Sequence, residues 1–327
     1  MSLAPYIHAM GRGPSRSRSL TRQEATDAMA QILAGNAAPE AVGALLMLMR
    51  FRGETPAELA GFTQSARDTL TGWTDLPVAL DWPSYAAGRS RGLPWFVLSA
   101  LLVVRAGHRV LLHGCNARQT PVSDVRDAAR ALGIPFVACP VSAGDALTRQ
   151  GIAYAPLDAI SPELLGLLRL RDVLGLRSAI NTVCRMLNPA AAPAMVQGVF
   201  HPAYRELQRD AAELLGQCRM MVIKGGGGEF ERHPGKACAL YGLEEADPFN
   251  ETAPPLIDAH RRLADGAASR DHLIRLWQGE SADPWAEAVV TGTAALALRA
   301  ADPRLDANAA ERSALDLWKT RHRQAAA

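Results

Sequence analysis

Short strand-like runs alternate with longer helix-like runs along most of the chain, and this alternation limits it to few folds. "PVALDWP" (77–83), "RVLLHG" (109–114) and "RMMVIKG" (219–225) are apolar and have the length of strands. "LPWFVLSALLVVRAGH" (93–108) lies between the first two and has the length of a helix. Strands and helices in alternation imply parallel pairing through right-handed crossovers, so we expect an α/β domain over residues 76–327. The other expected strands are 136–140 and 194–200.

Two T-x-x-E spacings mark helix starts near the amino terminus. Thr21 is followed by Glu24, and Thr55 is followed by Glu58. In this capping box the hydroxyl and the carboxylate satisfy backbone N–H groups that have no partner inside the helix. We expect a helical domain over residues 1–75, which the helices of 161–188 join. Its expected helices are 21–34, 39–52 and 55–70.

The helix expected at 39–52, "PEAVGALLMLMRFR", is apolar nearly all round. A helix of this kind packs on more than one side. It would form a self-complementary homodimer interface together with the helix at 161–174, or it would be a buried core helix. The sequence leaves both interpretations open.

Composition describes an ordinary globular protein. The chain has 327 residues, 48% of them hydrophobic, and a net charge of +2. Its start does not resemble a secretory signal, and the longest apolar stretch, Pro94–Ala106, is too short to span a bilayer. We expect a cytoplasmic protein without a membrane partner. The five cysteines are spaced singly, which is typical of reduced thiols rather than of metal ligands or disulfides.

Three loops after the expected strands carry glycine, arginine or histidine: "DWPSYAAGRSRG" (81–92), "HGCNARQTPVSD" (113–124) and "VIKGGGGEFER" (222–232). Ligands bind at the carboxyl ends of the strands in an open parallel sheet, so these loops should converge. Together they favour an anion site. The candidate residues are Arg89, Arg91, His113, Asn116, Arg118, Lys224, Gly225, Gly226, Gly227, Gly228 and Arg232.

Each loop also has a plainer interpretation. The glycine run lacks both a Walker lysine-serine pair and a G-x-G-x-x-G register, so it would also fit a surface turn. His113 would equally be a hydrogen-bonded histidine at a strand end. Arg89 and Arg91 would equally form a solvated face.

Residues 151–189, "GIAYAPLDAISPELLGLLRLRDVLGLRSAINTVCRMLNP", resemble a block of anthranilate phosphoribosyltransferases. In that family G-F-x-F-A-P precedes a helix, then V-R-x-x-L-G-x-R-T and F-N-L-L-G-P-L-x-N-P. "HGCNAR" (113–118) stands where the family has K-H-G-N-R, and "VIKGGGGEFE" (222–231) where it has V-V-H-G-x-x-G-L-D-E. The resemblance implies the fold of this glycosyl transferase family 3 type, with a helical domain beside an α/β phosphoribosyltransferase domain.

The departures from the family pattern concern its phosphate and metal groups. The G-T-G-G-D loop, whose amides hold the pyrophosphate of phosphoribosyl pyrophosphate in that family, is replaced by "DWPSYAAGRSRG". Leu112 stands for the lysine before H-G, and Phe230 for the aspartate of the D-E pair that helps hold magnesium, which leaves Glu231 as a candidate ligand. These groups stabilise the leaving group, so transfer from phosphoribosyl pyrophosphate is not expected.

The loops that remain resemble the divergent YbiB branch of the family. This resemblance implies a homodimer that binds single- or double-stranded DNA or RNA without sequence preference. Arginine and lysine would contact phosphates, and Trp82, Tyr85 or Trp95 would stack on bases, unless the tryptophans are core residues. The leading expectation is therefore a catalytically inactive nucleic-acid binder with no catalytic residue, metal or cofactor. The alternative is a pentosyl or phosphoribosyl transferase acting on a phosphorylated ribose or a nucleoside, which would use Mg²⁺.

Overall fold

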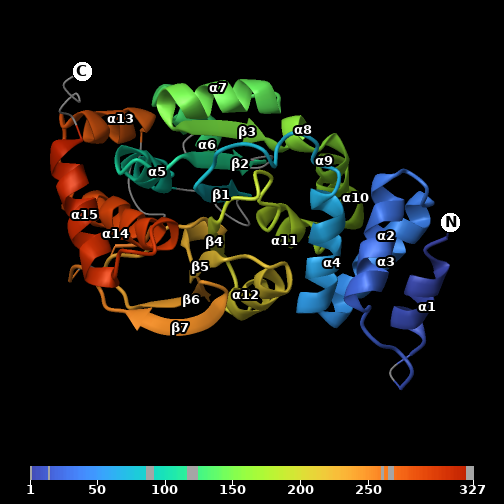
Figure 1. Ribbon diagram of the computed structural model, residues 1–327. Helices are drawn as coiled ribbons and strands as arrows, with labels where there is room; N and C mark the ends of the chain where they lie inside the picture. Colours follow the sequence, from blue (N-terminus) through green and yellow to red (C-terminus); the bar gives the residue numbers. More distant parts are fainter. Residues whose placement is uncertain are drawn as a thin grey trace.

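The computed structural model shows a helical bundle at one end of the molecule and a seven-stranded sheet covered by helices at the other (Figure 1). This arrangement confirms the predicted fold class of an α/β sheet domain with a helical domain. Within the described part of the chain, no helix is long and apolar enough to cross a membrane. The described residues are 2–13, 15–85, 92–115, 124–258, 261–263 and 269–321.

The amino-terminal helices form where the sequence places them. Both capping boxes are present, at the starts of α2 and α4. Glu58 is fully buried, and besides its bonds to Thr55 it accepts a hydrogen bond from the backbone N–H of Leu20 at 2.9 Å. This carboxylate therefore joins α4 to the segment that leads into α2. The helices are α1 (Ala4–Gly11), α2 (Arg22–Leu33), α3 (Pro39–Arg52) and α4 (Pro56–Arg67).

The sheet has the strand order β3-β2-β1-β4-β5-β6-β7. The first five strands pair in parallel, and β6 and β7 add an antiparallel edge. The order reverses between β1 and β4, which makes the carboxyl ends of these two strands the expected place for a ligand. The strands are β1 (Leu80–Ser84), β2 (Val110–Gly114), β3 (Ile152–Pro156), β4 (Ala194–Val199), β5 (Arg219–Lys224), β6 (Cys238–Glu244) and β7 (Asp247–Ala253).

The sheet differs from the expectations in two ways. Residues 136–140 form no strand: only an isolated bridge joins Phe136 to Tyr154, and Pro140 already begins a helix. The third strand is instead "IAYAP" at 152–156, and the hairpin of β6 and β7 was not expected. Phe136 and Tyr154 pack with ring centroids 4.7 Å apart, so the run from 136 contributes packing rather than pairing.

Helices cover both faces of the sheet and divide its core in two. Trp82 and Phe96 belong to the cluster on the face covered by α5 and α14, where the Ser99 hydroxyl donates to the carbonyl of Val290 at 2.9 Å. Met195 and Val222 face the other side and join a continuous cluster with α12 and the bundle. The covering helices are α5 (Phe96–Arg105), α6 (Val125–Ala131), α7 (Pro140–Gln150), α12 (Tyr204–Leu214), α13 (Arg270–Gln278), α14 (Pro284–Ala301) and α15 (Ala307–Thr320).

A chain of short helices carries the backbone from β3 past the bundle and back to β4. Arg67, near the end of α4, donates to the carbonyls of Met186 and Leu187, each at 2.9 Å. Burial lowers the pKa of Arg67 to about 10. The guanidinium thus binds the bundle to the segment that precedes β4. The short helices are α8 (Leu157–Ile160), α9 (Pro162–Arg169), α10 (Arg171–Leu174) and α11 (Ile180–Arg185).

Helix α3 is a core helix on one side, and its role in a dimer stays a prediction. Leu46 is fully buried inside the chain, so it does not face a partner. Leu174 of α10 packs close to Gly43 in the first half of α3, and its neighbour Val173 is 82% exposed. Phe51, at the other end of α3, is 90% exposed. One side of α3 is therefore core, and because α3 and α10 each carry an exposed apolar side chain, self-association stays a prediction.

We expect the substitution Glu58→Ala to lower the free energy of unfolding by about 2–3 kcal/mol, because a buried carboxylate with several hydrogen bonds is lost. Glu24→Ala removes the equivalent carboxylate of α2, which is partly exposed and paired with Arg18, so its cost should be about 1 kcal/mol. Urea unfolding of both variants measures the difference. Equal losses would show that the bond from Glu58 to Leu20 contributes nothing.

The homodimer prediction is tested with Phe51→Asp combined with Val173→Asp. If the exposed apolar side chains of α3 and α10 belong to the interface, sedimentation at micromolar concentration should show a dimer for the wild type and a single chain for the variant. Val141→Asp is the matched control, because Val141 is an equally apolar side chain that is 76% exposed on α7, outside α3 and α10. A wild-type mass of one chain would refute the prediction.

Candidate functional site

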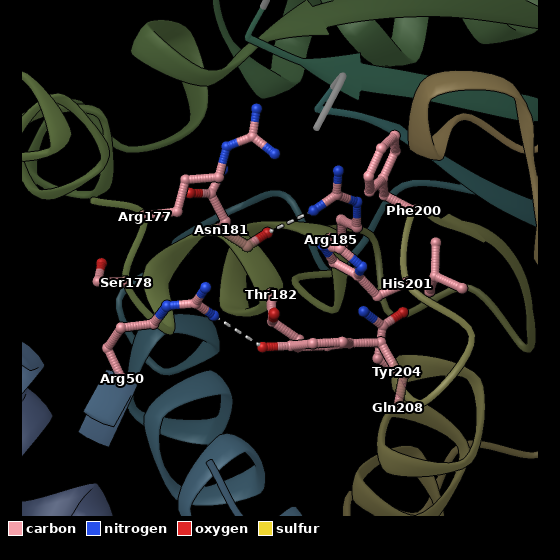
Figure 2. Close-up of a pocket in the computed structure, with 11 residues that line it drawn as sticks. Arg50, Arg177, Ser178, Asn181, Thr182, Arg185, Phe200, His201, Tyr204 and Gln208 are labelled. Carbon is pink, nitrogen blue, oxygen red and sulfur yellow. Dashed lines mark hydrogen bonds between the residues drawn. The ribbon is translucent and has the colours of Figure 1, made fainter. Parts of the chain in front are cut away.

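A pocket opens where the helical bundle meets the carboxyl end of β4 (Figure 2). Its volume is about 90 Å³, and three arginines line it together with aromatic and polar side chains. No described Asp or Glu is among the lining residues. The lining consists of Arg50, Arg177, Ser178, Asn181, Thr182, Arg185, Val199, Phe200, His201, Tyr204 and Gln208.

The lining side chains come from three parts of the chain. Arg50 lies near the end of α3, and Figure 2 shows it extending toward Tyr204 of α12. Its guanidinium donates to the Tyr204 hydroxyl at 3.4 Å, and that hydroxyl donates to Glu54 at 3.0 Å. Burial and the neighbouring Glu54 carboxylate raise the pKa of Tyr204 to about 12. The tyrosine therefore stays neutral and holds Arg50 at the pocket.

Arg185 at the end of α11 is the most buried of the three arginines that line the pocket. Its guanidinium donates to the carbonyl of Tyr85 at 2.7 Å and to that of Asn181 at 3.3 Å. The side chain of Gln197 on β4 donates to the Arg185 carbonyl at 2.9 Å. Burial lowers the pKa of Arg185, while the charge of Glu229 acts in the opposite direction. These bonds fix Arg185 between β1 and β4.

The glycine run lies beside this pocket. Lys224 ends β5 and is the ladder partner of Val199, a lining residue, and the N–H of Gly225 donates to the Val199 carbonyl at 3.2 Å. A Cβ on Gly225 would run into the carbonyl oxygen of Glu229, and Gly227 has φ of +65°. Position 225 therefore has no room for a side chain, and position 227 has a backbone conformation that favours glycine. The run forms a tight turn after β5.

Two glutamates follow that turn and are fully buried. Glu229 accepts from the Ser84 hydroxyl at 3.2 Å, at the end of β1. Glu231 accepts from the N–H of Phe96 at 3.1 Å, at the start of α5. Glu231, the candidate metal ligand, thus caps a helix. Within the described ranges, no three His, Cys, Asp or Glu side chains group together as a metal site.

His113 lies inside the sheet rather than at its surface. It is fully buried on β2, with Nδ1 3.0 Å from the Tyr85 hydroxyl and Nε2 3.2 Å from the carboxylate of Asp81. The structure therefore matches the interpretation of a hydrogen-bonded histidine at a strand end. The His113 side chain therefore links β1 to β2, and because it is buried it cannot bind an anion that enters from solvent.

Several other candidates lie away from solvent. Arg232 is 1% exposed; its guanidinium pairs with Glu311 at 3.0 Å and donates to the carbonyl of Pro254 at 2.7 Å. Trp82, Tyr85 and Trp95 are at most 3% exposed. The expectation that Arg232 contacts phosphates and that these rings stack on bases is therefore wrong, because the side chains are enclosed by the core.

The remaining predicted residues divide into two groups. Lys224 is exposed at the sheet edge and Gly225–Gly228 form the turn beside the pocket. Arg89, Arg91, Asn116 and Arg118 lie outside the described residues.

Sequence reasoning missed the arginines that line the pocket. Arg177 falls in the L-G-x-R motif of the quoted block, and Arg185 stands where the quoted pattern has the proline of G-P-L. Both arginines lie in the block that resembles the family, so comparison with the family pattern could have identified them as candidate site residues. Arg50 carries no motif and meets the pocket only through the packing of α3.

Comparison with known proteins gives three sequence findings. A family model described as "Glycosyl transferase family, helical bundle domain" matches residues 4–70. Anthranilate phosphoribosyltransferase of Halobacterium salinarum is 30% identical over 230 residues, covering 70% of this chain and 67% of the relative. The enzyme of Symbiobacterium thermophilum is 28% identical over 220 residues, covering 67% of this chain and 64% of the relative. The matched segment is thus a little under two thirds of the length of several relatives.

Solved structures show the same fold over nearly the whole chain. Anthranilate phosphoribosyltransferase from Thermus thermophilus superposes with a TM-score of 0.81 at 22% identity, covering 98% of this chain and 94% of that one. The Saccharomyces cerevisiae enzyme in complex with PRPP and Mg gives 0.77 at 14% identity, covering 98% and 93%. These likenesses establish the fold.

The expectation of sequence-independent nucleic-acid binding is corrected by these findings. The relatives and structural neighbours described above are phosphoribosyltransferases. The rings expected to stack on bases are also buried. The alternative of a transferase acting on a phosphorylated ribose or a nucleoside agrees better with both observations.

We expect His113→Leu to lower the free energy of unfolding by about 3 kcal/mol, because it leaves the Tyr85 hydroxyl and the Asp81 carboxylate buried without their partner. His8→Leu is the control, since His8 is a surface residue that accepts from Arg12. Thermal and urea unfolding measure both. A His113 variant as stable as the control would show that this buried chain of bonds does not hold β1 against β2.

Proposed function

Because this chain belongs to the anthranilate phosphoribosyltransferase family, we propose that it transfers a pentosyl group from a phosphorylated ribose to an acceptor bound in the arginine-lined pocket. The observation that carries the proposal is the position of that pocket. It lies at the reversal point of the sheet, between the end of β4 and the bundle, with the glycine turn of β5 beside it.

The two ligands of such a reaction would occupy neighbouring places. The donor phosphates suit the glycine turn and exposed Lys224, where backbone comes close to a ligand without side-chain obstruction. The acceptor suits the pocket, where Arg177 and Arg185 provide positive charge. Since Val199 and Lys224 are ladder partners, the two places are adjacent along the sheet edge.

The reaction breaks the bond between the anomeric carbon of ribose and the leaving phosphate oxygen, and forms a bond from that carbon to the acceptor. The acceptor loses a proton, and the leaving group departs as an anion. Groups that stabilise this developing negative charge lower the barrier most. In this chain Lys224 is the described cation at the turn, and the pocket arginines hold the acceptor in position.

Magnesium accompanies the donor in the yeast relative. The described residues of this chain do not fit a magnesium site of their own, because Glu229 and Glu231 are buried and accept from Ser84 and from the start of α5. Phe230 stands where the family pattern has aspartate, and its ring packs on Trp82. No step of the proposal depends on a metal held by these carboxylates.

The proposal is tested with phosphoribosyl pyrophosphate and a panel of anionic acceptors that includes anthranilate. We expect acceptor-dependent release of pyrophosphate, and we expect Arg177→Ala to lower kcat/KM about a hundredfold, because a charge-assisted contact to the acceptor is lost. Arg52→Ala is the matched control, since Arg52 is exposed at the end of the same helix as Arg50 but does not line the pocket.

Two results would contradict the proposal. The first is the absence of acceptor-dependent turnover with every acceptor in the panel. The second is turnover that Arg177→Ala leaves at the wild-type rate, which would place the reaction elsewhere.

A further inference from the structure

Arg185 gives this chain a charge that the quoted family pattern lacks. Residues 180–189 read "INTVCRMLNP", and the pattern reads F-N-L-L-G-P-L-x-N-P, so Arg185 replaces the proline. Proline carries neither a charge nor a hydrogen-bond donor. The replacement therefore adds a guanidinium to a pocket that already contains Arg50 and Arg177.

Hydrogen bonds to the protein hold the guanidinium of Arg185 in place, but they use only part of its N–H donors. The side chain of Arg185 donates to the carbonyls of Tyr85 and Asn181. A guanidinium has five N–H donors, so further donors remain for the pocket that Arg185 lines. Arg185 is 6% exposed, and burial of a charge is costly unless a partner of opposite charge is close.

Two described glutamates lie near the pocket without lining it. Glu229 acts on the charge of Arg185 and accepts a hydrogen bond from Ser84. Glu54 accepts from the Tyr204 hydroxyl, which in turn accepts from Arg50. Neither glutamate lines the pocket. The lining thus contains three guanidinium groups and no described Asp or Glu, so a ligand with two negative charges can pair with more of these groups than a ligand with one.

We propose that the pocket selects a compact ligand with two negative charges, either a phosphate monoester or a dicarboxylate, and that Arg185 determines this selectivity. The inference rests on the proposed function in one respect, namely that this ligand is the acceptor of the transfer. Forked pairing of guanidinium with carboxylate or phosphate gives such a ligand both affinity and orientation. Phe200, which is 46% exposed, supplies an aromatic wall for the body of the ligand.

Figure 2 shows the three arginines of the pocket lining. Arg177 and Arg185 extend from the α11 region toward the same side of the view, and Arg50 approaches from α3. The guanidinium groups therefore come from two parts of the chain, the α11 region and α3, and a ligand with two anionic groups can engage more than one of them.

The test is calorimetric titration with benzoate, phthalate and phenyl phosphate, which share one ring and differ in charge. The wild type should bind phthalate, phenyl phosphate or both at least about tenfold more tightly than benzoate. Arg185→Gln should weaken binding of the preferred dianion about tenfold or more and change benzoate binding by less than about threefold. Arg185→Lys, which keeps the charge without the fork, should fall between them, and Arg52→Gln should bind as the wild type does.

Benzoate binding as tight as both dianions, binding of no probe at millimolar concentration, or an unchanged preference in a folded Arg185→Gln would each overturn the inference. The ligand series on the wild type alone decides the first two outcomes, so a variant that does not fold leaves the test intact. The pyrophosphate assay separates the two proposals. Dianion preference without turnover would refute the transferase, and turnover without dianion preference would refute only the ligand class.

Discussion

The joint between α11 and the two central strands is the constraint on which the site depends. Arg185 donates to the Tyr85 carbonyl just after β1, and Gln197 of β4 donates to the Arg185 carbonyl. The two strands on either side of the sheet reversal are thus bound to one residue. Arg67 extends the joint into the bundle through the carbonyls of Met186 and Leu187. The backbone carbonyl of Arg185 and the guanidinium of Arg67 hold the bundle beside the carboxyl end of β4, where the pocket lies, and these bonds do not need the side chain of Arg185.

Much of the fold followed from local patterns. The capping boxes at Thr21 and Thr55 located α2 and α4, because each side chain bonds a neighbour three residues away in the chain. The prediction of a strand at 136–140 was wrong because an apolar run of strand length does not show whether its backbone pairs with a neighbouring strand. The β6 and β7 hairpin was missed because β7, "DPFNETA", is mostly exposed and polar, so it carries no apolar run.

The site was predicted less well than the fold, and the reason is burial. In the sequence, Arg232 lies close to a glycine run, which suggests an exposed loop. Only the tertiary structure shows that Arg232 is buried and that it pairs with Glu311, 79 residues away. His113 similarly bonds Asp81 of β1 and Tyr85 just after that strand. The turn at Gly225–Gly228 was found because glycine marks close backbone approach locally. Arg50 could not be found, because its place at the pocket depends on tertiary structure, which brings its side chain to Tyr204 of α12.

The account's central claim is that the arginine-lined pocket holds the acceptor while the glycine turn holds the phosphorylated ribose. A crystal structure of the protein with phosphoribosyl pyrophosphate and an aromatic dianion such as phthalate tests this most directly. The account predicts the dianion within hydrogen-bond distance of Arg177 and Arg185, with donor phosphate at the turn that follows Lys224. A dianion bound elsewhere, or a donor bound away from the carboxyl ends of β4 and β5, would contradict it.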